Sequence, residues 1–359
     1  MEVRVLSGAL REQAAPALLP VPTTIVEFDF NWRDGERTIR FGRGSIIEAP
    51  RLVGEGFVLF TTPRAREQFP GLEAGAISIV EVPPGLVDEI AGEILDIELP
   101  GERIVALGGG RVIDTAKAVS AALPREVPVA AIPTTLSAAE MTWVHRQARG
   151  APEGSGTVRA RLVVNDPTAS ASQPLPGLAA SAANALGHAI EGACTSLASP
   201  VPTMAALRAA QLLAEGLPAG EEPDIDRLAL GALLSGYAID ANWYGIHHVL
   251  SQTLVRVAGA GHGQANAAML PVTVAALRER RPEQLARVDE TLGEPAEAVA
   301  ARFAMRAEAP SLQAIGVQED LLESCANAAA ERAELALTPP PAGADELLEL
   351  YRAAWAPVS

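Results

Sequence analysis

Histidine is the residue type whose spacing in this chain most directly suggests chemistry. The 359-residue sequence contains five histidines, and four of them fall in two short stretches: His188, His247, His248 and His262. An imidazole can transfer a proton near neutral pH or bind a metal ion. One isolated histidine is more often a hydrogen-bonded core residue. Four rings in two stretches instead predict a common cleft in which all four are catalytic candidates.

Helical spacing adds an asparagine to this group. Asn184 and His188 are four residues apart in a segment of helical periodicity, 180–197, and therefore share one face of a helix. His248 and His262 would come from a second helix and from the start of a third, across a glycine-rich turn. We expect Asn184 to face the same cleft as the imidazoles.

A second candidate site is the segment RIVALGGGRVIDTAKA, residues 103–118. An apolar strand runs into three glycines and a helix opens at once, so backbone N–H groups and the positive helix N-terminus can hold a pyrophosphate. The pattern is neither the G-x-G-x-x-G fingerprint nor a P-loop, because Ala118 follows the lysine. A tight turn without a ligand is the alternative. The residues expected to contact a dinucleotide here are Gly108, Gly109, Gly110, Asp114 and Lys117.

The use of lysine in this chain is unusual. Of the 28 basic residues, Lys117 is the only lysine, and all the others are arginines. A compact ammonium occupies places that a planar guanidinium cannot, which makes Lys117 a candidate for a specific site. The alternative is chance survival on a helix surface, and composition alone favours neither.

The elements that must position these residues change type along the chain. The first half alternates short β-branched runs with amphipathic segments, which predicts a doubly wound, mainly parallel sheet. Prolines and small residues interrupt this pattern at 169–178, and helical periodicity follows. We predict an α/β dinucleotide-binding domain over 1–174 and an all-helical domain with the histidine site over 175–359. The expected strands are Thr38–Phe41, Gly56–Phe60, Ala76–Val80, Arg103–Leu107 and Val127–Ile132, and the expected helices include Leu86–Leu95 and Val112–Ala122.

Composition excludes several classes of function. The formal charge of -16 argues against general binding to nucleic acid, which clustered Lys and Arg would grip. No apolar run approaches the ~20 residues of a membrane helix, and the N-terminus has no signal-peptide pattern, so we expect a cytoplasmic protein. Cys194 and Cys325 lie far apart without metal-ligand spacing, and we expect buried, inert thiols.

Both candidate sites resemble segments of the iron-containing alcohol dehydrogenase superfamily. GGGRVIDTAK, residues 108–117, is similar to its GGGSxxDxAK segment, and AIPTTLSAAEMT, residues 131–142, resembles the IPTTxxxSEMT loop of its maleylacetate reductase branch. Residues 165–174 resemble the stretch before the domain crossing, and 179–196 and 245–271 resemble its two histidine blocks. The resemblance covers nearly the whole chain and implies the dehydroquinate synthase-like fold of that superfamily.

The resemblance also bears on metal binding. In metal-dependent members, three histidines and one aspartate hold Fe(II) or Zn(II); the histidines map onto His188, His248 and His262, and the aspartate position is Asn184. A neutral amide is a poor ligand for a dication. Maleylacetate reductases carry asparagine there and work without metal. The resemblance thus implies a metal-free reductase, while a zinc or iron alcohol dehydrogenase held by three imidazoles is the alternative.

Other segments both support and depart from the maleylacetate reductase branch. TIRFGRGS, VLFTTPRAR and the paired His247 and His248 resemble that branch. By contrast, Gln252 stands where its members usually have histidine, the turn around His262 is closer to the metal-dependent branch, and Arg111 replaces the serine of the glycine loop. Substrate identity is therefore open.

The resemblance places a nicotinamide ring in the cleft between the domains. We expect Thr134 and Thr135 to flank the cofactor at the end of their strand. At the end of the second predicted strand, Thr61, Thr62 and Arg64 stand where an NAD-specific site usually has an acid, so we expect NADPH to be accepted at least as well as NADH.

Hydride transfer to an electron-poor double bond or carbonyl leaves negative charge on oxygen. The imidazoles of His188, His248 and His262, with His247 second, are the expected proton donors or fixed dipoles. A small anionic substrate such as maleylacetate also needs positive charge, for which Arg146 and Arg256 are candidates.

Two more distant functions stay open on the sequence. One is a lyase or cyclase resembling 3-dehydroquinate synthase, in which bound NAD is recycled. The other is a cofactor-binding protein without catalysis. We also expect a homodimer, in which the strand-like segment 26–30 pairs across a two-fold axis.

Overall fold

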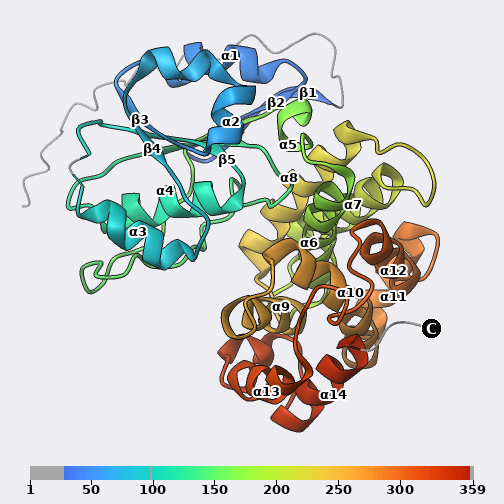
Figure 1. The fold of residues 1–359 in the computed structure, drawn as a ribbon. Coiled ribbons are helices and arrows are strands. Elements are labelled where there is room, and N and C mark those ends of the chain that lie inside the picture. Colours follow the sequence, from blue (N-terminus) through green and yellow to red (C-terminus); the bar gives the residue numbers. More distant parts are fainter. Residues whose placement is uncertain (1–27, 98, 356–359) are drawn as a thin grey trace, which may run out of the picture.

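The computed structural model describes residues 28–97 and 99–355, which form a sheet-containing domain followed by a helical domain (Figure 1). The first domain holds one seven-stranded sheet of order β1-β2-β7-β6-β5-β3-β4. All neighbouring strands are parallel except the edge pair β1 and β2. The strands are β1 Asp29–Asp34, β2 Arg37–Gly42, β3 Phe57–Thr61, β4 Ala76–Glu81, β5 Ile104–Gly108, β6 Val129–Pro133 and β7 Leu162–Asn165.

The central strands bury side chains on both faces. In β5, Val105 and Leu107 join one apolar core, and Ile104 and Ala106 join the opposite one, because successive side chains of a strand point to opposite faces. Helices α1 and α2 cover the first face, and α3 and α4 the second (Figure 1). The helices of this domain are α1 Ser45–Val53, α2 Pro63–Gln68, the 3-10 helix η1 Pro70–Gly75, α3 Val87–Leu95, α4 Gly110–Ala122 and the short α5 Pro167–Ser170.

The second domain is a bundle of helices around α6. This helix is rich in alanine and glycine and is buried almost all round, as expected for a helix in the middle of a bundle. It contacts α7, α8, α10 and α12. The helices are α6 Leu175–Cys194, α7 Pro200–Gly216, α8 Ile225–Asn242, α9 Ile246–Val257, α10 His262–Arg280, α11 Pro282–Leu292, α12 Ala296–Arg306, α13 Leu322–Ala330 and α14 Ala344–Trp355, with short 3-10 helices η2 Glu319–Leu321 and η3 Ala333–Leu337.

The predicted fold class is confirmed. Each of the five predicted strands overlaps one of β2 to β6, and both predicted helices match α3 and α4. The four-residue β7 was missed, because so short an apolar run between loop residues has no clear alternation. The strand-like segment 26–30 lies partly outside the described residues, and β1 begins at Asp29. Cys194 and Cys325 are buried and free, as predicted.

Polar contacts connect the two domains at two places. Arg43, before α1, makes a two-pronged contact with Asp226 at the start of α8, with its closest approach at 2.9 Å. Arg256 in α9 reaches Asp88 in α3 at 3.2 Å. These pairs fasten the helical domain to the sheet domain next to the carboxyl ends of the strands.

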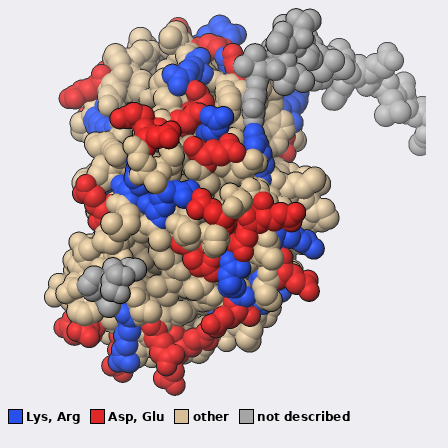
Figure 2. All heavy atoms as spheres, turned by 90° about the vertical axis from the view of Figure 1, so that its right-hand side faces the viewer, with Lys and Arg blue, Asp and Glu red and all other residues tan. Residues whose placement is uncertain are grey.

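The surface mixes both signs of charge. Figure 2 shows acidic and basic side chains interspersed over one face, in keeping with the net charge of -16. In the described part of the chain, no helix combines the length and the apolar character that a membrane span requires.

Candidate active site

The glycine turn lies at the carboxyl end of β5, where a doubly wound sheet binds its ligands. No side chain caps the N-terminus of α4, so its first N–H groups stay open to a ligand. A Cβ on Gly109 would lie 2.8 Å from Thr135 Cγ2, and one on Gly110 would lie 2.9 Å from Ser137 Oγ. The loops after β5 and β6 therefore pack closely only because these positions lack side chains, and they leave a backbone surface that fits a dinucleotide pyrophosphate.

The four predicted cofactor threonines differ in their surroundings. Thr134 N donates to the Gly108 carbonyl at 2.9 Å, and Thr135 Oγ1 has no hydrogen-bond partner within the described ranges. Thr61 is buried and its hydroxyl donates to the Thr62 carbonyl, while Thr62 Oγ1 caps α2. Thr134 and Thr135 thus lie against the glycine turn, and the hydroxyls of Thr61 and Thr62 are committed to the protein.

The sole lysine fastens a loop. Lys117 is fully buried, and its ammonium donates to the carbonyls of Ala139 (2.9 Å) and Thr142 (3.0 Å) and pairs with Asp114 at 2.7 Å. A guanidinium is too broad and too planar to place its charge among these three groups. Lys117 therefore holds the loop after β6 onto α4, and its contact with a cofactor stays a prediction.

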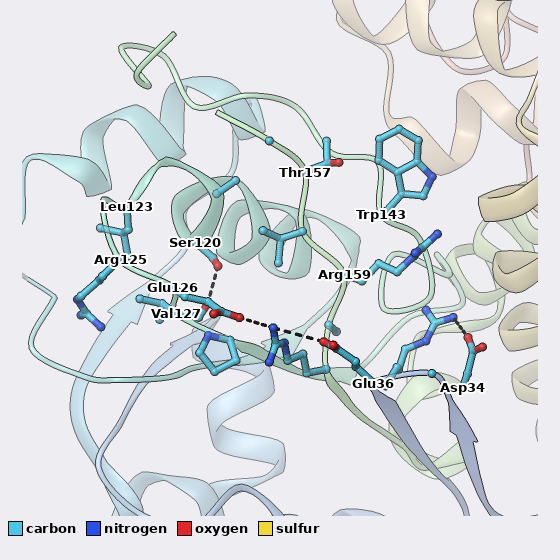
Figure 3. Close-up of a pocket in the computed structure, with 18 of the residues that line it drawn as sticks. Asp34, Glu36, Ser120, Leu123, Arg125, Glu126, Val127, Trp143, Thr157 and Arg159 are labelled. Carbon is cyan, nitrogen blue, oxygen red and sulfur yellow. Dashed lines mark hydrogen bonds and ion pairs between the residues drawn. The ribbon is translucent and has the colours of Figure 1, made fainter. Parts of the chain in front are cut away.

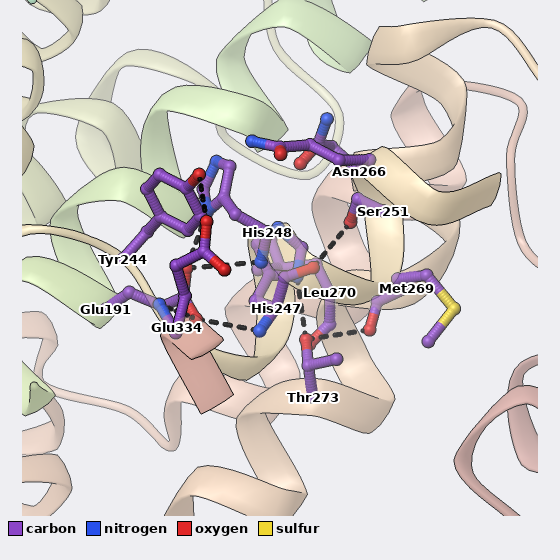
Figure 4. A network of polar contacts seen from close by, with 12 residues as sticks. Glu191, Tyr244, His247, His248, Ser251, Asn266, Met269, Leu270, Thr273 and Glu334 are labelled. Atoms are coloured by element: carbon purple, nitrogen blue, oxygen red, sulfur yellow. Dashed lines mark hydrogen bonds and ion pairs between the residues drawn. The ribbon is translucent and has the colours of Figure 1, made fainter. Parts of the chain in front are cut away.

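Three of the four candidate histidines are packed together on α6 and α9. Figure 4 shows the two on α9, His247 and His248, with their polar partners. The rings of His188 and His248 stack with centroids 4.5 Å apart and planes within 11°. His248 Nδ1 lies 2.6 Å from Glu191 Oε2, and His247 Nδ1 lies 2.8 Å from Thr273 Oγ1. Glu191 also accepts the backbone N–H of His247 at 2.7 Å. The buried rings of His247 and His248 are thus each held by a polar partner on a neighbouring helix.

These partners fix the protonation of the rings. Thr273 Oγ1 donates to main-chain carbonyls of its own helix, so it accepts from His247 Nδ1, and the Glu191 carboxylate accepts from His248 Nδ1. Both Nε2 atoms therefore carry lone pairs, and neither has a partner among the described residues. Burial lowers the pKa of His247 to about 3, so its ring is neutral at pH 7.

Asn184 and His262 complete the cleft. Asn184 Nδ2 donates to the Ser137 carbonyl at 3.4 Å, which joins α6 to the loop after β6. His262 opens α10, and its side chain is exposed. Desolvation by the surrounding protein lowers the pKa of His262, and the charge of Asp114 on α4 offsets part of this effect. Asn266 Nδ2 lies 3.4 Å from His262 Nε2 and donates to it, which leaves the His262 proton on Nδ1.

Comparison with known proteins identifies the family. The model of the iron-containing alcohol dehydrogenases matches residues 37–147, and the model of the C-terminal domain of the Fe-containing alcohol dehydrogenase family matches residues 178–355. The chain belongs to the iron-containing alcohol dehydrogenase family. It is an oxidoreductase.

Two relatives indicate which part of this family it resembles. The maleylacetate reductase of Pseudomonas sp. (strain P51) is 30% identical over 311 residues, which cover 80% of this chain and 87% of that protein. The crystal structure of maleylacetate reductase from Agrobacterium tumefaciens superposes with a TM-score of 0.75 at 25% identity, covering 91% of this chain and 98% of that one. The resemblance to the maleylacetate reductase branch is confirmed.

The fold alone does not separate the branches. An iron-containing alcohol dehydrogenase from Corynebacterium glutamicum superposes with a TM-score of 0.76 at 23% identity, over 89% of this chain and 95% of that one. Both branches of the iron-containing alcohol dehydrogenase family thus share this architecture, and the chemistry depends on side chains in the cleft.

In this chain, the side chains of the candidate site fit a divalent metal ion poorly. Asn184 contributes a neutral amide where a carboxylate would balance charge. The His188 and His248 rings stack face to face instead of converging on one point. Across residues 28–97 and 99–355, no three His, Cys, Asp or Glu side chains come together as a metal site. We therefore derive the chemistry from hydrogen bonds and proton positions.

Sequence analysis missed the residues that hold the imidazoles. Glu191 is fully buried and lies three residues after His188, one helical turn along α6. A carboxylate one turn beyond His188 and two turns beyond Asn184, on an otherwise apolar helix, was the available signal. Thr273 offered none, because a threonine inside α10 is equally compatible with the backbone hydrogen bond that it also makes.

A separate cavity of about 950 Å³ lies away from this site (Figure 3). Its walls come from the segments just before β2, β6 and β7, at the amino ends of these strands. The glycine turn occupies the opposite, carboxyl edge of the sheet, where ligands of such sheets bind. The charged residues that line the cavity include Glu36, Arg37, Arg125, Glu126, Arg159 and Arg161.

Proposed function

We propose that this oxidoreductase uses NAD(P)H to reduce maleylacetate, or a closely similar unsaturated keto dicarboxylate, without a metal ion. The observation that carries the proposal is Asn184 among the imidazoles, in a chain that is 30% identical to a maleylacetate reductase over 311 residues. Maleylacetate is a six-carbon dicarboxylate whose ketone is conjugated to a carbon–carbon double bond, so it is electron-poor at the carbon β to the ketone.

The cofactor would bind across the glycine turn. When bound, NAD(P)H supplies the hydride. The N–H groups at Gly109 and Gly110 would hold its pyrophosphate, and the exposed Arg111, which has no acidic partner among the described residues, would add positive charge. No acid stands at the end of β3, where Thr61 ends the strand, and this supports the use of NADPH as well as NADH.

The proposed reduction adds one hydride and one proton to the carbon–carbon double bond of the substrate. Hydride adds to the carbon β to the ketone, the electrons of the double bond move to the ketone oxygen, and the resulting enolate takes a proton on the neighbouring carbon. NAD(P)H is oxidised to NAD(P)+. The chain must therefore place hydrogen-bond donors near the enolate oxygen.

The hydrogen-bond pattern assigns these roles among the histidines. His262 Nδ1 carries a proton that faces the cleft, and His188 Nδ1 has no partner within the described residues and can carry one. His247 and His248 have committed their Nδ1 protons to Thr273 and Glu191, so they present acceptors. His188 and His262 are the donors that this arrangement favours, and His248 serves to orient His188 by stacking on it.

The test is oxidation of NADH and NADPH by chelator-treated protein, with maleylacetate and simple aldehydes offered in parallel. We expect turnover of maleylacetate that a chelator does not lower. Asn184→Asp is the matched variant, because it restores the missing carboxylate, and we expect it to bind zinc more tightly than the natural chain. Activity of the natural chain that returns only with added iron or zinc would contradict the proposal.

A metal-dependent alcohol dehydrogenase is the second candidate. The observation that favours it is the set of ring nitrogens without partners, which includes His188 Nδ1 and His248 Nε2. Metal analysis of the purified protein separates the two functions. Binding of NADPH without net turnover would instead point to a cyclase or to a protein that only binds the cofactor.

We also propose a homodimer in the cytoplasm. The antiparallel edge strand β1 supports it, because no strand of residues 28–97 and 99–355 pairs with its outer side, where a second copy could add. Solution scattering that gives the mass of a monomer would contradict the dimer.

A further inference from the structure

Guanidinium groups gather around one amide beside the imidazoles. Gln252 lies on α9, one turn beyond His248, and its Oε1 accepts hydrogen bonds from Arg146 Nη2 (3.3 Å) and Arg332 Nη2 (3.2 Å). Arg256 follows Gln252 by four residues and so lies on the same face of α9. The amide oxygen accepts from two guanidinium groups that are distant in the sequence. Without this shared acceptor, their like charges would repel each other.

The three arginines differ in how their charge is balanced. Arg256 pairs with Asp88 at 3.2 Å, and Arg332 pairs with Glu334 at 2.8 Å. Arg146 makes no ion pair with any acid in the described part of the chain, and its side chain is exposed. Arg146 is therefore the member of the group whose positive charge is left for a ligand.

This unbalanced charge lies beside the reacting groups. Arg332 also donates to Tyr244 OH at 3.2 Å, and the Tyr244 ring is 5.8 Å from the ring of His248 (Figure 4). The charge of Arg146 lowers the pKa of His262, so Arg146 also acts on the histidine at the start of α10. An anion at Arg146 would thus lie close to α9, the helix that carries His247 and His248.

We infer that Arg146 binds a carboxylate group of the substrate, and that Gln252 and Arg332 position it. The inference rests on the proposed function, since it names the group that recognises a dicarboxylate. A guanidinium donates two parallel hydrogen bonds to a carboxylate, which fixes orientation as well as charge. With one carboxylate on Arg146, the substrate would lie close to His248, which precedes Gln252 by one turn of α9.

The cofactor is a less suitable anion for Arg146. Its pyrophosphate belongs at the N-terminus of α4, and a 2'-phosphate belongs at the end of β3, both in the sheet domain. Arg146 instead donates to a residue of α9 in the helical domain. The experiment below separates these two anions by measuring both KM values.

The test compares Arg146→Gln with Arg149→Gln. Arg149 lies on the same loop, is exposed, and pairs with Glu89 at 2.6 Å, so it is the matched control. We expect Arg146→Gln to raise the KM for maleylacetate about 10- to 100-fold, as for the loss of a charged hydrogen bond. The KM for NAD(P)H should change less than about twofold, and Arg146→Lys should recover part of the loss. Arg149→Gln should match the natural chain.

Binding of adipate to the NADP+-saturated protein gives a second readout that does not need turnover. We expect calorimetry to show adipate binding in the natural chain and in Arg149→Gln, and at least tenfold weaker binding in Arg146→Gln. If maleylacetate is not reduced but adipate binding depends on Arg146, the carboxylate site stands and the proposed function fails. If maleylacetate is reduced equally by both variants, or if Arg146→Gln raises the KM for NAD(P)H instead, the carboxylate site is refuted.

Discussion

The glycine turn and the imidazole cluster are built in opposite ways. The turn consists of the backbone of Gly108 to Gly110, three consecutive residues, and depends on the absence of side chains. The cluster consists of side chains from α6, α9 and α10, and the two rings on α9 are held by the buried partners Glu191 and Thr273. A local backbone feature can be recognised from consecutive residues, whereas the cluster exists only after three helices have packed.

The two regions also differ in energetic cost. Leaving N–H groups open at a helix end in water costs little, because water satisfies them. The cluster buries Glu191, His247 and His248 together, and both Nε2 atoms lack partners within the described ranges. An unsatisfied buried polar atom costs roughly 1–3 kcal/mol. Such a cost is typical of sites where polar atoms are kept available for a ligand.

The largest expected effect is the loss of a proton donor from the cluster. His262→Asn removes the imidazole that faces the cleft, so kcat should fall about 10²- to 10⁴-fold, the range for general acid catalysis. The KM for NAD(P)H should stay unchanged, since the glycine turn is untouched. Steady-state kinetics with maleylacetate measures both. A kcat within threefold of the natural value would remove His262 from the chemistry.

A smaller loss is expected from the residue that holds a ring. In Glu191→Gln, an amide N–H would meet His248 Nδ1 and force the ring proton onto Nε2, so the acceptor on that ring is lost. We expect kcat to fall about 10- to 100-fold, as for other partners that orient active-site histidines.

Ser251→Ala is the control for Glu191→Gln. Its hydroxyl donates to the His247 carbonyl on the same helix and does not hydrogen-bond to an imidazole ring. Equal kinetics of the two variants would show that the tautomer of His248 does not matter.

The loop after β6 contains Glu140, which should make the stability of the protein depend on pH. Burial raises the pKa of the Glu140 carboxyl to about 7, so the folded chain keeps a proton that the unfolded chain has already released above its ordinary pKa near 4.5. Glu140 therefore does not change the free energy of unfolding below about pH 4.5, and it lowers that free energy as the pH rises towards 7. In Glu140→Gln this loss is absent. The difference in free energy of unfolding between the variant and the natural chain should therefore grow by about 2 kcal/mol from pH 5 to pH 7. Urea unfolding at several pH values measures it, with the exposed Glu153→Gln as control. A difference that stays constant with pH would contradict the effect.

The smallest expected effect concerns the turn. In Gly109→Ala the new methyl would meet Thr135 Cγ2 at 2.8 Å, so the two loops must separate. We expect the KM for NAD(P)H to rise about tenfold, or ~1.4 kcal/mol in binding, with kcat nearly unchanged. Gly156→Ala is the control, because nothing lies within 4 Å of its Cβ position. If both variants have the natural KM, the turn does not hold the cofactor.

Much of the fold was predictable because each strand and helix of the sheet domain carries its own pattern. The apolar runs that became β3, β5 and β6 are bounded by glycine, proline and charge, so their limits were predicted to within about two residues. β7 was missed because its four residues are held by pairing with β2 and β6, which is a tertiary effect.

The sequence by itself determined the α/β order of elements, the glycine turn and the membership of four histidines in two blocks, because these depend on consecutive residues and their periodicity. Only the tertiary structure decided that Lys117 fastens a loop, that Glu191 and Thr273 set the tautomers of His248 and His247, and that Arg146 and Arg332 meet on Gln252. These contacts join residues from 22 to 106 positions apart. Burial and hydrogen-bond partners at that separation follow from how the helices pack, and no local pattern encodes them.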